Sequence, residues 1–203
     1  MKNWIACLCV LFLTLQSCKK DTSTSANADG PFYYKATIGG TYYEAMSKAN
    51  PTGPTDYWSG SGMGGQESVS FSSSINPLTH PIPVGYTELE ITKGILYNYY
   101  VATNATVKDF LSPGTYPYKT TTIQGISILW VDKEGSLWST HYGSQDQTGS
   151  NFKILSTEEY NDPSVMYSLK VKMQFNCKLY KEDTGEMKEL TNGEMVGLFA
   201  RLK

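Results

Sequence analysis

The sequence predicts an all-β fold, an antiparallel β-sandwich or partly open barrel with at most one short helix. The strongest observation is the segment 167–180, in which six apolar residues from Leu169 to Leu179 alternate with polar ones. A period of two fits a strand with one buried and one wet face, and it matches no helical phase. The remaining chain consists of aromatic and β-branched runs separated by Gly, Pro and Asn turn signals, with almost no helical pattern.

The other elements follow in chain order. Gly39-Gly40 tolerates the positive φ of a tight turn, so the aromatic runs on either side of it predict a β-hairpin. Thr103 or Asn104 can cap a helix of one or two turns, which Ser112-Pro113-Gly114 would stop. The expected elements are a hairpin over 32–46, a long Gly-rich loop over 47–66, strands over 67–75 and 87–92, a helix over 103–111, a short strand around 116–118, strands over 125–131 and 136–140, a hairpin turn over 181–187, a turn over 191–194 and a last strand over 195–202.

The N-terminus predicts the compartment. A single Lys2 precedes an apolar run of about 12 residues, the length of a signal-peptide core and short of a membrane span. The run Leu15-Gln16-Ser17-Cys18 resembles a bacterial lipobox. The resemblance implies that the chain is cleaved before Cys18 and that Cys18 carries fatty acyl chains such as palmitate. Acyl chains worth about 0.8 kcal/mol per buried methylene would anchor the protein durably. We therefore expect a signal peptide over 1–17, Cys18 with a flexible tether over 18–31, and one domain over 32–203.

Composition limits the remaining function classes. The 203 residues carry 18% charged side chains and a net charge of −2, which argues against a nucleic-acid partner. After cleavage and lipidation Cys177 would be the only free thiol, and its phase in 167–180 predicts a buried, inert side chain. Stability is therefore expected to come from the packed core and not from a disulfide or a zinc site.

The order of KATIGGTYYEA, SPGTYPY and ELTNGEMVGLFA resembles a group of Bacteroidota lipoprotein domains of unknown function, and SCKKD resembles the start of such lipoproteins. The resemblance covers most of 32–203. It implies an exported all-β domain in the cell envelope, held at the outer membrane and facing either the periplasm or the surface. It implies no activity.

Groups that could carry chemistry are sparse. Glu88 and Glu90 are expected on one strand face, about 6.6 Å apart along the backbone, which is compatible with a glycosidase pair but common on exposed strands. The acidic run containing Glu158, Glu159 and Asp162 lacks the pattern of a Ca²⁺ loop. The sequence predicts no catalytic residue, no metal site and no cofactor.

Aromatic side chains are the remaining lead. Tyr57 and Trp58 stand in the segment interpreted as a loop, and Trp138 stands near a strand end, where exposed rings could stack on a ligand. The prediction is a non-catalytic, membrane-anchored envelope lipoprotein that binds a glycan or another envelope protein, or has a structural role. The alternatives are a glycan-binding accessory module that uses Tyr57, Trp58 and Trp138, and a hydrolase that uses a carboxylate pair.

Overall fold

The structure is a computed structural model that describes residues 32–203 except positions 49, 51, 54–55 and 66. The predicted signal peptide, Cys18 and the tether lie outside the described residues. The elements are β1 (Tyr33–Ile38), β2 (Thr41–Met46), β3 (Tyr57–Gly64), β4 (Ser68–Pro77), β5 (Glu88–Tyr97), a 3₁₀ turn (Tyr99–Val101), α1 (Asn104–Phe110), β6 (Gly114–Thr115), β7 (Ile126–Val131), β8 (Leu137–Ser139), β9 (Asn151–Tyr160), β10 (Tyr167–Lys181) and β11 (Met187–Arg201).

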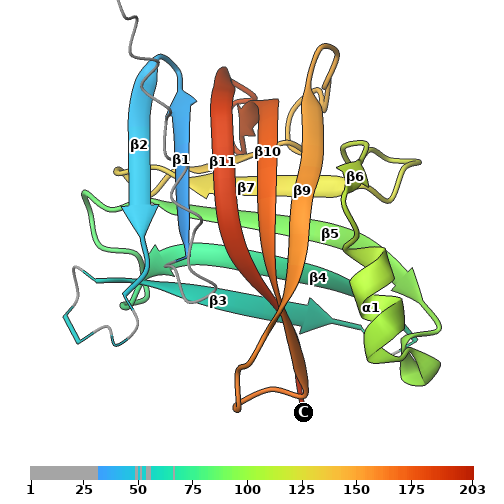
Figure 1. Cartoon of the computed structure of the whole chain (residues 1–203). Helices are drawn as coiled ribbons and strands as arrows, with labels where there is room; N and C mark the ends of the chain where they lie inside the picture. Colours follow the sequence, from blue (N-terminus) through green and yellow to red (C-terminus); the bar gives the residue numbers. More distant parts are fainter. Residues whose placement is uncertain (1–31, 49, 51, 54–55, 66) are drawn as a thin grey trace, which may run out of the picture.

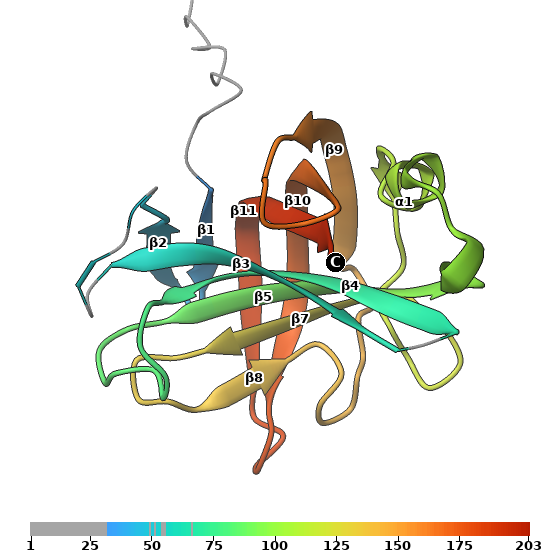
Figure 2. The same ribbon diagram turned by 90° about the horizontal axis from the view of Figure 1, so that it is seen from below.

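The strands form one antiparallel sheet that curls into a nearly closed barrel, as the sequence predicted (Figure 1). The strand order is β2-β1-β11-β10-β8-β7-β5-β4-β3, with β9 beside β10 and β6 beside β9. Figure 2 shows β3, β4, β5 and β7 side by side, with β10 and β11 crossing them. One layer contains β3, β4, β5, β7 and β8, and the other contains β9, β10 and β11 (Figure 2). The long β10 joins these two layers, because its first part pairs with β9 and its end pairs with β8.

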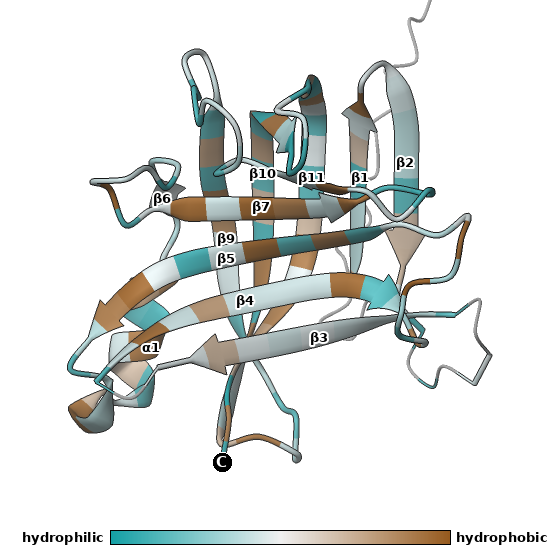
Figure 3. Ribbon diagram, turned by 180° about the vertical axis from the view of Figure 1, so that it is seen from behind, coloured by the Kyte–Doolittle hydropathy of each residue, from teal (hydrophilic) through white to brown (hydrophobic). Residues whose placement is uncertain are grey.

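The core lies between these layers. Along the first half of β5 apolar positions alternate with polar ones, whereas β7 is apolar at every position but Ser127 (Figure 3). In both strands Leu89, Ile91, Ile126, Ile128 and Trp130 are buried. Phe152 and Phe175 stack with ring centroids 5.9 Å apart, and Trp130 and Trp138 lie 6.4 Å apart. Burying such rings removes large apolar areas from water and so stabilises the folded chain.

Several predicted elements are confirmed. The hairpin turns at Gly39 and Gly40, which both have positive φ. The side chain of Thr103 accepts a hydrogen bond from the backbone N–H of Thr106 (3.2 Å) and so caps α1. Among the described residues, no helix is long and apolar enough to cross a membrane.

The expectation of a continuous loop over 47–66 is wrong, because Tyr57–Gly64 forms β3. Its glycines serve packing within a strand. The six-membered ring of Trp58 lies over Gly60, where a Cβ would approach the Trp58 Cη2 atom to 2.8 Å. The composition of the segment is that of a loop, but its alternation places every glycine from 60 to 64 on one face.

The turn expected over 191–194 is also wrong. β11 runs through it with a bulge, in which Asn192 takes a positive φ and the pairing with β10 shifts between Phe175 and Cys177. Asn-Gly suits a bulge as well as a hairpin turn, since both need the left-handed region. β9 was not predicted at all.

Candidate ligand-binding site

Polar and small side chains gather on the outer face of the layer formed by β3, β4, β5 and β7. The pairing register places Gly62 opposite Ser72, Ser72 opposite Thr92, and Thr92 opposite Ser127. These residues alternate with buried core residues, so they point away from the barrel interior. We call this row the hydroxyl band.

A second row lies beside the hydroxyl band. Gly60 stands opposite Ser74, and Ser74 stands opposite Glu90. The second row continues from Glu90 to Leu129 of β7, which is half-buried. On β3 the outward positions are glycines except for Trp58. Because one side of the Trp58 ring rests on Gly60 and the side chain is only half-buried, an aromatic surface adjoins the two rows.

Two carboxylates lie at the same face of β5, with different surroundings. Glu88 is 8% exposed, and the side-chain amide of Asn76 donates to its Oε1 atom (3.2 Å). Burial, with a smaller contribution from the charge of Glu90, raises the pKa of Glu88 above its ordinary value. Glu90 is half-buried and accepts a hydrogen bond from the Thr92 hydroxyl (3.0 Å). Glu90 is therefore the more accessible acceptor of the pair.

His141 lies at the far end of the hydroxyl band. Its Nδ1 atom is 2.7 Å from both the Ser127 and the Ser139 hydroxyls, and the Ser139 hydroxyl donates to the carbonyl of Ile128 (2.9 Å). Burial lowers the pKa of His141, and the charge of Lys119 adds to this effect. Within the described part of the chain no carboxylate contacts the ring, so the third member of a nucleophilic triad is not in place.

The structure separates the three aromatic residues that the sequence singled out. Trp58 is on the outer face, whereas Tyr57 packs against the core and its hydroxyl accepts a hydrogen bond from the Thr87 N–H (3.2 Å). Trp138 is 2% exposed, and its Nε1 atom donates to Asp132 (2.8 Å). Trp138 is thus a core residue on the inner face and offers no free ring face to a ligand. Trp58 and Glu90, by contrast, lie on the same outer face, with β4 between their strands.

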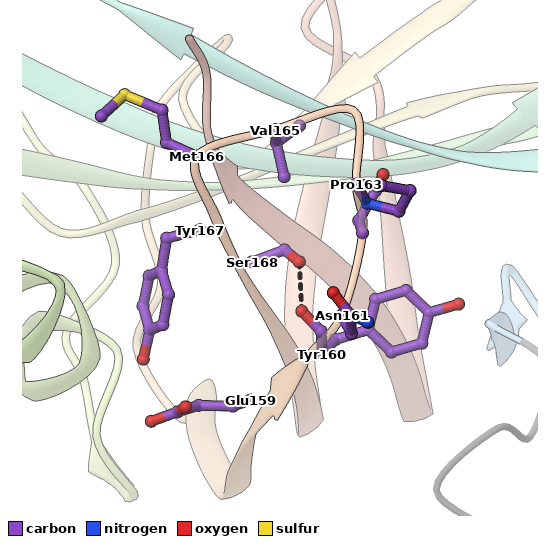
Figure 4. A pocket seen from close by; sticks show the side chains of 9 residues that line it. Glu159, Tyr160, Asn161, Pro163, Val165, Met166, Tyr167 and Ser168 are labelled. Carbon is purple, nitrogen blue, oxygen red and sulfur yellow. Dashed lines mark hydrogen bonds between the residues drawn. The ribbon is translucent and has the colours of Figure 1, made fainter.

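A hollow of about 390 Å³ lies elsewhere, in the connection between β9 and β10 (Figure 4). Polar atoms that line this hollow hydrogen-bond to one another, since the Ser168 hydroxyl donates to the carbonyl of Tyr160 (2.6 Å). Glu159 forms an ion pair with Lys108 of α1 (2.9 Å). Two smaller hollows of about 230 and 320 Å³ lie over β10 and β11. In the larger of these, Glu194 is already paired with Tyr33 and Lys35.

The structure also shows the surroundings of the acidic run and of Cys177, which the sequence analysis considered. No cluster of three metal-ligating side chains occurs among the residues that the structure describes, those around Glu158 and Asp162 included. Cys177 is buried at 4% exposure, and burial raises the pKa of its thiol strongly.

Sequence reasoning missed the hydroxyl band and Lys93. The band consists of single Ser, Thr and Gly residues from four strands, and only the pairing register shows that they are neighbours. The burial of Lys93 could have been predicted, because Lys93 follows Leu89 and Ile91 at the alternate positions that point inward. It is 8% exposed, with its Nζ atom 3.9 Å from the ring centroid of Phe110 and 4.2 Å from that of Tyr116.

No protein-family model, no curated protein and no solved structure matches the chain. The likeness to Bacteroidota lipoproteins therefore stays a prediction from the motifs themselves.

Proposed function

We propose that this protein is a lipoprotein of the cell envelope, anchored through Cys18, whose β-barrel domain binds a polyhydroxylated ligand such as a glycan. The observation that carries the binding proposal is the placement of the half-buried Trp58 ring, the hydroxyl band and Glu90 on one outer sheet face. The observation that supports the anchor is the lipobox-like run ending at Cys18.

The chemistry of such a face suits sugars. A pyranose ring has apolar C–H faces that stack on an indole, and its equatorial hydroxyls point sideways. Hydroxyls of Ser72, Ser74 and Thr92 can both donate and accept hydrogen bonds, and an ionised Glu90 accepts only. An outer sheet face also admits an extended chain, which a closed pocket would reject.

The binding proposal is tested by screening the purified chain against an array of neutral and acidic oligosaccharides, followed by titration calorimetry with the best binder. Trp58→Ala should weaken binding at least tenfold, and Glu90→Gln should weaken it less. Tyr100→Ala is the matched control, because Tyr100 is 70% exposed in the 3₁₀ turn after β5 and belongs to neither row. If the array shows no binding, or Trp58→Ala binds as tightly as the unaltered chain, the proposal is abandoned.

The anchor has its own test. Expression in a bacterium that processes lipoproteins, followed by mass spectrometry, should give a chain that begins at an acylated Cys18. A chain that still begins at Met1 would contradict the anchor and leave the ligand proposal untouched.

A carboxylate-dependent hydrolase is the second candidate. The raised pKa of Glu88 favours it, since a general acid needs a carboxyl group that holds its proton. Release of reducing ends from any oligosaccharide that the protein binds would support hydrolysis, provided that Glu88→Gln abolishes it. Binding without release assigns the face to recognition alone.

A further inference from the structure

The strand β3 ends the sheet, and one side of its backbone is open. Only β4 is hydrogen-bonded along its length. At its start the backbone N–H of Lys48 donates to the carbonyl of Tyr57 (2.9 Å), so the backbone groups of Tyr57 point away from β4. Because strand residues alternate in direction, the backbone groups of Ser59, Ser61 and Met63 point to the same open side. Within the described ranges, the pairing on that side of β3 does not continue beyond the single bridge of Tyr57 with Ser47.

This edge lacks the usual protection. Exposed edge strands are normally blocked by a charge, a proline or a bulge. The segment YWSGSGMG has none of these, and it pairs with β4 in unbroken register. The opposite edge, β2, carries Glu44. β3 is therefore the edge at which another strand can add to this sheet.

The strand is also complementary to itself. If two copies run antiparallel about a twofold axis at Ser61, Trp58 faces Gly64 of the partner subunit and Gly60 faces Gly62 of the partner subunit. Each large ring then meets a residue without a side chain, and no like charges meet. The open donors and acceptors of Ser59, Ser61 and Met63 would form about six inter-strand hydrogen bonds.

We propose that two copies of this protein associate through antiparallel pairing of β3 with β3, centred on Ser61. A contact of this kind is isologous and closes after two copies. The twofold axis is perpendicular to the sheet, so both outer faces lie on the same side. If the proposed ligand face is correct, the dimer presents two Trp58 rings on one continuous surface, and a long ligand binds with the gain of a bivalent contact.

The register is tested by disulfide cross-linking in the full chain with Cys7, Cys9 and Cys18 replaced by serine, purified in mild detergent. Ser61→Cys should form an intermolecular disulfide on mild oxidation, since paired residues across antiparallel strands have Cα atoms about 5.5 Å apart. Ser72→Cys is the matched control, because it is half-exposed on β4, one strand away from the edge. A monomeric Ser61→Cys chain, or equal cross-linking of both variants, overturns the proposal.

A second measurement does not depend on cysteine. Ser61→Pro removes one donor from the open side only, so the monomer should keep its circular dichroism spectrum. Sedimentation equilibrium should show association at least tenfold weaker for Ser61→Pro than for Ser61→Ala. Equal association of the two variants overturns the proposal. The outcome is independent of glycan binding, because no ligand is added.

Discussion

Lys93 offers the sharpest quantitative prediction, because it places a cation in the core with no carboxylate beside it among the described residues. Its Nζ atom lies between the rings of Phe110 and Tyr116. Burial lowers the pKa of Lys93 from 10.5 to about 8. In the unfolded chain the amine returns to its ordinary pKa near 10.4.

The sign of the effect follows from proton binding. Below pH 8 both states carry the charge, and the folded state bears the full cost of desolvating it. Between pH 8 and about 10.4 the folded state loses the proton while the unfolded state keeps it, so this group makes stability rise with pH in that window. The magnitude is at most about 3 kcal/mol, since one pKa unit equals about 1.4 kcal/mol. Two cation–π contacts of about 0.5–1 kcal/mol each offset part of it, and about 1–2 kcal/mol remains.

The assay compares the unaltered chain with Lys93→Met, which fills similar volume without the charge. Urea unfolding followed by tryptophan fluorescence at pH 7.0 and 9.8 gives the free energy of unfolding of both. Lys93→Met should be the more stable chain at pH 7.0, and its advantage should shrink by about 1–2 kcal/mol at pH 9.8. Cys177 and Tyr118 have raised pKa values and destabilise the fold at high pH, but equally in both chains. If the difference in free energy of unfolding between the two chains were the same at both pH values, the reasoning would be refuted. Such a result would mean that the two aromatic rings offset the whole cost of burying the charge.

Three further predictions concern packing. Cys177 should resist alkylation in the native state and react only after unfolding, as peptide mapping by mass spectrometry would show; rapid native labelling would contradict its burial. Asp132→Ala leaves the buried Trp138 Nε1 atom without its acceptor and should lower the free energy of unfolding by about 1–3 kcal/mol in urea titrations, whereas an unchanged value would mean that water replaces the carboxylate. Gly193→Ala drives a Cβ into the ring and carbonyl of Phe175 and should lower the midpoint of thermal unfolding, by a cost of about 1–3 kcal/mol; an unshifted midpoint would show that the bulge relaxes freely.

The fold class was predictable because the alternation of β10 admits only an extended conformation, and because Gly39-Gly40 supports one tight turn. Composition misled where it was used alone. The glycines and serines of β3 have the same signature whether they form a loop or the flat face of a strand. Asn192-Gly193 likewise serves a turn or a bulge, and only the partner strand β10 decides between them.

The candidate site was predictable only in part. Trp58 and the pair Glu88 and Glu90 were recognised as separate features, but their proximity depends on the register of β3, β4 and β5. Trp138 carries the same aromatic signal as Trp58 and lies on the opposite side of its sheet. Its pairing with Trp130 across β7 and β8 fixes that side, and such a cross-strand pair is invisible before the strands are aligned.

The two faces of β5 separate stability from recognition. Leu89, Ile91 and Lys93 point into the barrel, so changes there alter the free energy of unfolding. Glu90 and Thr92 point outward and are only half-buried, so changes there should alter binding more than the free energy of unfolding. This separation makes the proposed function testable without ambiguity: a Glu90→Gln chain that unfolds at the usual urea concentration yet binds less tightly has lost a ligand contact and not its fold.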